Sequence, residues 1–225
     1  PFINNAREVA RWLGGTNSDD ISLSLDWQPN DRAIGIVKPV KGGALTGRSF
    51  DYSLNFETVH TTRKTITVDE QIPIPKNIDI ANTYAQANNQ GRIAALAAQF
   101  FKERGPVIVM HARPDWVWSL AEHLKTKTNR VEAIHDDVKL LQDYLRLELG
   151  DSFPLVDLIE YGIAVHHSGL PEEVRTLIEW LFENERIEFL VATTTIAQGI
   201  NFPVSGVVMA SHQYFSPQGA EDMPP

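Results

Sequence analysis

The 225-residue sequence contains no cysteine. Disulfide bridges, thiolate zinc sites and cysteine nucleophiles are therefore excluded as sources of stability or chemistry. The sequence also lacks any apolar run that approaches the roughly 18 residues a membrane-spanning helix needs. We expect a cytoplasmic protein without a membrane partner.

Positive charge is scarce as well. Twenty Lys and Arg residues face 29 Asp and Glu residues, which gives a net charge of −9. Tight, free-standing nucleic-acid binders are mostly basic, so a general electrostatic attraction to DNA or RNA is disfavoured. Between residues 107 and 212 the balance is 8 basic minus 16 acidic, or −8. Any nucleic acid must therefore be held by a few local groups.

The first third of the chain mixes two patterns. Residues 1–15 have apolar positions at helical spacing and end on two glycines, which indicates a short helix. Residues 21–68 include the alternating series Phe50, Tyr52, Leu54 and Phe56, which is typical of a half-buried strand. We predict a small antiparallel element here, with a turn at 41–47 and a linker at 71–76.

The remaining two thirds alternate between short apolar strands and amphipathic helices. This order predicts an α/β fold, in which a doubly wound parallel sheet is covered by helices on both faces. The predicted strands are 107–110, 163–166, 189–193 and 207–210, and the predicted helices are 85–101, 114–127, 138–149, 155–161 and 171–183.

Two motifs suggest chemistry that their context does not support. Gly42 to Ser49 has the glycine spacing of a phosphate-binding P-loop, with Arg48 in place of lysine. A P-loop must open a helix, whereas Ser49 to Val59 alternates like a strand, so we interpret the segment as a hairpin turn. His166 and His167 are adjacent, point to opposite faces of a strand and cannot chelate one metal, so we expect no metal site. Trp116, Trp118 and Trp180 lie in helical patterns, which favours core packing.

Two other segments are candidates for ligand contact. His167 to Arg175 opens a helix, with Pro171 at its start and two glutamates in the first turn. Val191 to Pro203 is an apolar strand that ends in three threonines, followed by glycine and asparagine. Ligands of open α/β sheets bind outside the carboxyl ends of the strands, where hydroxyl and amide groups suit phosphates. A solvated arginine and an ordinary polar turn remain the alternative interpretations.

Together these segments resemble the second RecA-like lobe of a superfamily-two ATP-dependent helicase, of the superkiller-type branch in the DEAD/DEAH-box group. Val107 to Pro114 is similar to motif IV, His167 to Arg175 keeps the family interval of eight, and Ala192 to Pro203 is similar to motif V. Phe182 falls at the expected packing position. Seven residues resemble the segment after motif III of the first lobe: Asn5, Ala6, Val9, Ala10, Trp12, Leu13 and Gly14.

The resemblance implies a fold, domain limits and residue roles. The fold is a RecA-like, P-loop-NTPase-type parallel sheet preceded by a small antiparallel β connector. Residues 1–20 would end the first lobe, 21–82 would form the connector, and 83–225 the second lobe. The residues that would contact nucleic acid are Arg113, His167, Ser168, Gly169, Arg175, Thr193 and Thr194. Those that would face the nucleotide are Gln198, Gly199 and Asn201, with Asn201 standing where DEAD-box relatives carry an aspartate.

Several helicase motifs are missing from the sequence. It contains no GxxxxGK[ST] followed by a helix, no D-E-x-H and no Q-x-x-G-R-x-G-R. Phosphoryl transfer needs the P-loop lysine, a magnesium carboxylate and usually an arginine from the last of these motifs. We expect a fragment with no catalytic residue of its own and no activity in isolation. ATP and Mg²⁺ would be held mainly by the first lobe of the same polypeptide.

The expected partners are single-stranded DNA or RNA, the first RecA-like lobe and downstream domains of the same chain. Two other functions stay open at this point. A Rossmann-like nucleotide-sugar enzyme would bind a sugar nucleotide and ignore nucleic acid, and a non-catalytic scaffold would use the lobe for docking.

Overall fold

A computed structural model describes residues 32–44, 50–62, 69–72, 89–197, 202–211, 213–216 and 219–222. The chain divides into two compact units. One comprises Pro1–Gly35 with Thr58–Thr67, and the other comprises Ile36–Glu57 with Val68–Pro225. In the described part of the first unit, Thr62 N–H donates to the Arg32 carbonyl at 3.0 Å. The expected helix at 1–15 lies outside the described residues, and the predicted domain limits stay a prediction.

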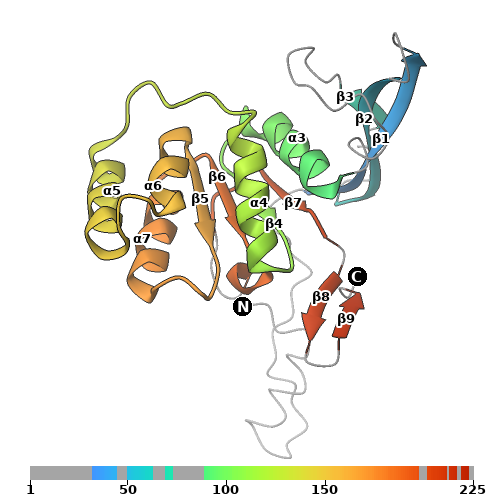
Figure 1. The fold of residues 1–225 in the computed structure, drawn as a ribbon. Helices are drawn as coiled ribbons and strands as arrows, with labels where there is room; N and C mark the ends of the chain where they lie inside the picture. The colour runs from blue at the N-terminus through green and yellow to red at the C-terminus, as the bar shows by residue number, and fades with distance from the viewer. Residues whose placement is uncertain are drawn as a thin grey trace, which may run out of the picture. The chain divides into compact units, whose positions relative to one another are not determined.

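The second unit is built on a four-stranded parallel sheet with the order β5-β6-β4-β7 (Figure 1). Its strands are β4 (Val107–Met110), β5 (Ile163–His166), β6 (Phe189–Ala192) and β7 (Gly206–Met209). Every residue of β4, β5 and β6 is buried, as expected for apolar strands covered on both faces. The sequence prediction of a parallel α/β sheet is therefore confirmed.

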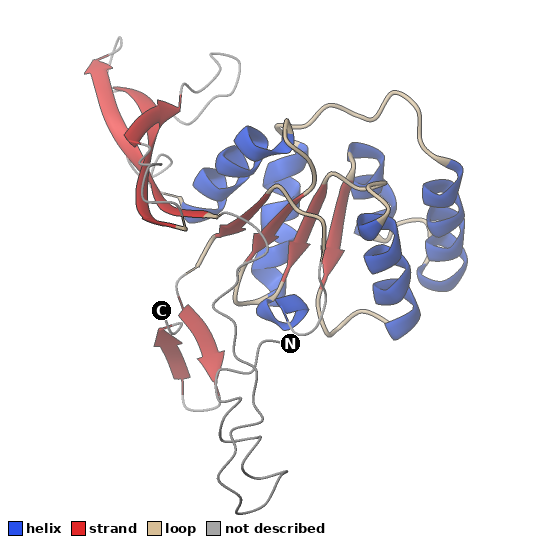
Figure 2. Cartoon of the chain, turned by 180° about the vertical axis from the view of Figure 1, so that it is seen from behind, coloured by secondary structure: helices blue, strands red, loops and turns tan. Residues whose placement is uncertain are grey.

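Helices follow the strands in the predicted order. They are α3 (Gln90–Lys102), α4 (Pro114–Lys125), α5 (Asp136–Leu149), α6 (Pro154–Leu158), the 3₁₀ turn η1 (Ile159–Tyr161), α7 (Glu172–Glu183) and the 3₁₀ turn η2 (Thr194–Ala197). The connections β4-α4-β5 and β5-α7-β6 run in opposite directions across the sheet, so right-handed crossovers place α4 and α7 on opposite faces. The view from behind in Figure 2 shows the strands in front of α4. Within the described segments, every helix is too short or too polar to cross a bilayer.

Two helix starts position the groups at the carboxyl ends of the strands. Pro114 occupies the first turn of α4, where its missing N–H costs nothing, and Asp115 lies beside the positive end of the helix. In the same way, Glu172 and Glu173 open α7 directly after Pro171. Both helices then bury one apolar stripe against the sheet, including Val117, Leu120 and Leu124 of α4 and Val174, Ile178 and Leu181 of α7.

The β-rich segment forms a separate three-stranded sheet in the order β1-β2-β3. Its strands are β1 (Ala33–Ala44), β2 (Phe50–Thr61) and β3 (Asp69–Ile72), with β2 and β3 antiparallel. Two predictions need correction here: β1 extends through Ala44 into the expected turn, and β3 covers the start of the expected linker. Strand β2 opens where a P-loop would open a helix, so the hairpin interpretation of that segment is preferred. A short hairpin, β8 (Gln213–Ser216) and β9 (Gly219–Asp222), follows later in the chain.

Candidate functional site

The carboxyl edge of the parallel sheet collects most of the buried polar side chains. We use this term for the last residue of each strand and the residues that follow it, the loop 167–171, and the first turns of α4 and α7. Six polar residues are buried in the described part of the chain, and His111, His166, His167 and Thr193 lie at this edge. Backbone bonds continue the ladder past the strand ends, because His111 N–H donates to Ala192 at 3.0 Å and Thr193 N–H donates to His166 at 3.1 Å. These side chains are therefore held by a rigid part of the fold.

Three buried side-chain nitrogens among the described residues have no hydrogen-bond partner. They are His111 Nε2, His166 Nδ1 and Arg175 Nε, and all three belong to the carboxyl edge. A buried polar atom left unpaired costs about 1–3 kcal/mol, so native proteins contain few of them. Their concentration where α/β sheets bind ligands marks this edge as the candidate site.

The side chain of His166 is held in place by a residue of α7. Its Nε2 lies 2.6 Å from Glu179 Oε1, and Glu179 follows Arg175 by one helical turn, so both side chains share a face of α7. Burial lowers the pKa of His166 and outweighs the opposing effect of Glu179, while the charge of Arg175 lowers it further. The ring is thus neutral at neutral pH. With Nε2–H donated to Glu179, the unpaired Nδ1 is an acceptor.

His167 organises the loop that precedes α7. Trp118 Nε1–H donates to His167 Nε2 at 3.1 Å, and Gly169 N–H donates to His167 Nδ1 at 3.0 Å. Burial, and then the neighbouring His166, lower the pKa of His167. A neutral ring has one acceptor nitrogen, so the two donors compete for it. A Cβ at Gly169 would lie 3.0 Å from the His167 ring, so a larger residue at this position would require the ring to shift.

His111 and Arg113 form the part of the edge that follows β4. The His111 ring lies 4.7 Å from the Trp116 ring, between centroids, and its Nδ1 accepts the Arg113 N–H at 3.3 Å. Burial lowers the pKa of His111, with Arg113 adding to the shift and Asp115 opposing it. The Arg113 guanidinium holds Asp115 through two bonds, at 3.1 and 3.0 Å. Arg113 would have to exchange that carboxylate in order to bind a phosphate.

The structure brings only some of the predicted site residues together. Thr193 N–H donates to the His166 backbone carbonyl, and the charge of Arg175 acts on the His166 ring, so both residues lie near His166. Thr193 is buried and Thr194 is half-buried, whereas Ser168 and Gly169 are exposed. The predicted nucleotide-facing residues Gln198, Gly199 and Asn201 lie outside the described residues.

Sequence reasoning missed two residues of the site and misplaced two tryptophans. His111 and Glu179 were not singled out, although a polar residue directly after an apolar strand and the spacing of four from Arg175 were available signals. Core packing was predicted for all three tryptophans of this region, but Trp116 is 49% exposed and Trp180 is 47% exposed. The buried stripes of α4 and α7 run through other residues, and Trp118 alone packs against the core.

Comparison with known protein families identifies the region that contains this edge. Residues 116–221 match the family described as the helicase conserved C-terminal domain. This part of the chain is similar to a helicase C-terminal domain. The match begins inside α4 at Trp116 and includes the loop around His167, α7 and the strands β5 to β7. Strand β4, His111 and Arg113 lie just before the matched residues.

Curated relatives agree with this family. The chain is 26% identical over 219 residues to Hachiman protein HamB of Bacillus cereus, covering 93% of this chain and 19% of the relative. It is 44% identical over 64 residues to the human U5 small nuclear ribonucleoprotein 200 kDa helicase, covering 28% of this chain and 3% of the relative. It is 36% identical over 90 residues to the RQC trigger complex helicase SLH1 of Saccharomyces cerevisiae, covering 39% and 4%.

The chain thus spans about a fifth or less of these relatives. The resemblance to a superfamily-two helicase of the superkiller-type branch is confirmed, and so is the RecA-like fold of the helicase domain.

Proposed function

We propose that this helicase domain contacts the phosphates of a single nucleic-acid strand through Arg175 and forms one wall of the ATP cleft in an ATP-dependent helicase. The observation that carries the proposal is the buried Arg175 Nε, which has no hydrogen-bond partner at the carboxyl edge. Arg175 is half-buried, and its Nε is shielded from water without a carboxylate partner, so this nitrogen remains a donor for an anion.

The surroundings of Arg175 suit one phosphate rather than a long polyanion. Arg175 lies in the first turns of α7, whose amino end attracts negative charge, and the loop before it exposes Ser168 and Gly169. The net charge of −8 over residues 107–212 repels a polyanion everywhere else. Binding therefore depends on few contacts and needs further surfaces in the intact protein.

The ATP part of the proposal rests on the family and on the sequence. Strand β2 follows the glycine-rich segment at 42–49, so the described residues do not fit a P-loop that could hold the phosphates of ATP by itself. ATP and Mg²⁺ would be held mainly by a first RecA-like lobe of the same polypeptide. This chain would add Gln198, Gly199 and Asn201 to the opposite wall, and lobe closure would couple ATP turnover to the strand contacts.

The test is a salt titration of single-strand binding by the full-length protein that carries this domain. Arg175→Ala should weaken binding without regard to sequence and should flatten the slope of log K against log[salt] by roughly 0.7, for one lost phosphate contact. Arg175→Lys should keep the slope but lose affinity, because lysine cannot form the bidentate contact. Nucleic-acid-stimulated ATPase activity should fall with Arg175→Ala, while ATP affinity without nucleic acid should hold.

Arg186→Ala is the matched control. Arg186 follows the far end of α7, its side chain is 41% exposed, and its Nε lies 4.0 Å from Asp137. It should change neither slope nor affinity. Unfolding of the Arg175→Ala chain should differ from wild type by no more than about 1 kcal/mol, because no partner is lost at Nε. Superimposable titrations for wild type and Arg175→Ala would reject the phosphate role.

A further inference from the structure

Trp116 is a large aromatic side chain that contacts two neighbouring groups and stays about half exposed. It lies in the first turn of α4 and is 49% exposed. The His111 ring packs against it at a centroid distance of 4.7 Å and an interplanar angle of 47°. The Arg113 guanidinium lies 6.0 Å from the same ring centroid and is itself held by Asp115. The indole is thus restrained by two neighbouring groups, while about half of its surface meets solvent.

His111 and Trp118 connect Trp116 to the carboxyl edge. His111, which supports the ring, directly follows β4 and keeps a buried Nε2 without a partner. Trp118, two residues further along α4, bonds to His167 in the loop before α7. The first turn of α4 therefore lies between the end of β4 and the loop that leads to Arg175.

Ordinary surface exposure does not account for this arrangement. Trp180 of α7 is exposed to nearly the same extent, at 47%. Among the described residues, neither an aromatic ring nor a cation packs against the Trp180 indole, whereas Trp116 has one of each. A restrained aromatic face loses little freedom when a second ring stacks on it, which favours binding.

We propose that Trp116 is a stacking platform for one base of the single strand. The inference rests on the proposed phosphate contact at Arg175 and adds to it a contact with the base. Every nucleobase has a π face, so stacking on an indole tolerates any sequence and requires a base that is not already stacked in a duplex. The site would therefore favour single strands over duplexes, which a phosphate contact alone does not do.

The experiment compares ordinary oligonucleotides with abasic oligonucleotides of the same length, which keep every phosphate and lack every base. Trp116→Ala in the full-length protein should weaken binding of the ordinary strand roughly 5- to 100-fold. The salt slope should stay the same, because no phosphate contact is lost. Binding of the abasic strand should not change. Trp116→Phe should recover most of the lost affinity, and Trp180→Ala should match wild type for both strands.

The outcomes separate this inference from the proposed function. If Arg175→Ala weakens binding and flattens the salt slope but Trp116→Ala affects neither strand, the stacking role is overturned and the phosphate role stands. Equal losses for ordinary and abasic strands would overturn it too, because Trp116 would then be acting through another part of the protein. A Trp116→Ala melting temperature equal to that of Trp116→Phe shows that a loss of binding is not a loss of folding.

Discussion

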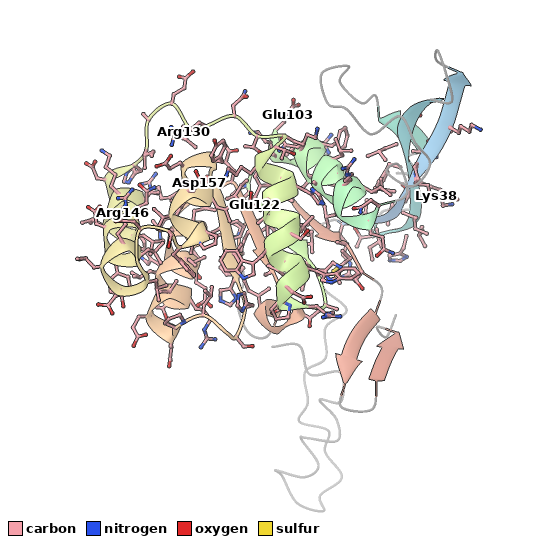
Figure 3. All side chains as sticks on the ribbon, in the orientation of Figure 1. Lys38, Glu103, Glu122, Arg130, Arg146 and Asp157 are labelled. Atoms are coloured by element: carbon pink, nitrogen blue, oxygen red, sulfur yellow. The ribbon has the colours of Figure 1, made fainter. Side chains whose placement is uncertain are left out.

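The two edges of the parallel sheet treat polar groups in opposite ways. At the carboxyl edge three histidines are buried, and three buried side-chain nitrogens, two from these histidines and one from the half-buried Arg175, are unpaired. At the amino edge, charges lie at the surface in pairs: Lys102 with Glu188 at 2.8 Å, Lys125 with Asp157, and Arg130 with Glu160. Figure 3 labels Arg130 and Asp157 in its upper part, on the amino side of the strands.

The two edges differ in what their polar groups do for stability. Exposed ion pairs contribute about 0.2–1 kcal/mol each and cost little to form. Buried polar atoms without partners cost about 1–3 kcal/mol each, so each of them calls for an explanation such as an ordered water or a ligand. The amino edge therefore carries paired charges, and the carboxyl edge carries unpaired buried groups.

The largest expected effect is at the amino edge. Phe189 begins β6, is fully buried and carries the Lys102 ammonium 5.7 Å from its ring centroid. Phe189→Ala should lower the free energy of unfolding by about 3–5 kcal/mol, since it removes a large ring from a closed core. Urea denaturation measures this. Phe100→Ala, at a ring that is 38% exposed, should cost much less, and equal losses would contradict the closed-core interpretation.

An intermediate effect should appear on acidification. The pKa values of His111, His166 and His167 lie below the ordinary 6.5, chiefly because of burial. As the pH falls below about 6.5, these histidines take up protons in the unfolded chain before they do so in the folded chain. The free energy of unfolding therefore decreases as the pH falls below about 6.5 and increases as the pH rises again. The slope should approach about 1.4 kcal/mol per pH unit for each histidine held neutral.

Denaturation between pH 5 and 8 tests this. His166→Asn should flatten the slope, whereas Glu188→Gln at the amino edge should not. His123, on α4, is shifted in the same direction by burial and by the charges of Arg92 and Lys127, so one part of the slope comes from outside the carboxyl edge. A slope unaffected by His166→Asn would show that this ring is not held neutral by the fold.

The smallest effect should come from an amino-edge ion pair. Lys102 and Glu188 have side chains that are 33% and 48% exposed. Their coupling energy in a double-mutant cycle with Lys102→Ala and Glu188→Ala should be about 0.2–1 kcal/mol and should shrink in high salt. A coupling energy above 2 kcal/mol would contradict the interpretation of this amino-edge ion pair as an ordinary exposed one.

The parallel sheet could be predicted from the sequence because its signals are local. Runs such as Val107 to Met110 are fully apolar, and Gly105 with Pro106 marks the turn before them. Strand ends and helix starts then place Arg175 and Thr193 near the same edge, as the general rule for α/β sheets requires. The placement of these two residues beside His166 agrees with that expectation.

The missed features depend on how consecutive elements pack. His166 contacts Glu179 across the connection from β5 to α7, and His111 contacts Trp116 across the turn from β4 to α4, and the hydrophobic pattern encodes neither contact. The outward position of Trp116 follows from which stripe of α4 is buried, a choice made by β5 and β6. Strand limits failed at Ala44 because pairing with a neighbouring strand, rather than propensity, decides where a strand ends.

The strand order also constrains how the protein is made. In the register of the sheet, Val107 of β4 pairs with Phe189 of β6, which is 189 − 107 = 82 residues later. A ribosome adds about 5–20 residues per second, so β4 is synthesised about 4–16 seconds before β6. Its other neighbour, β7, comes later still. Until then neither edge of this wholly apolar strand can pair within the sheet, and unpaired strand edges of this kind favour aggregation.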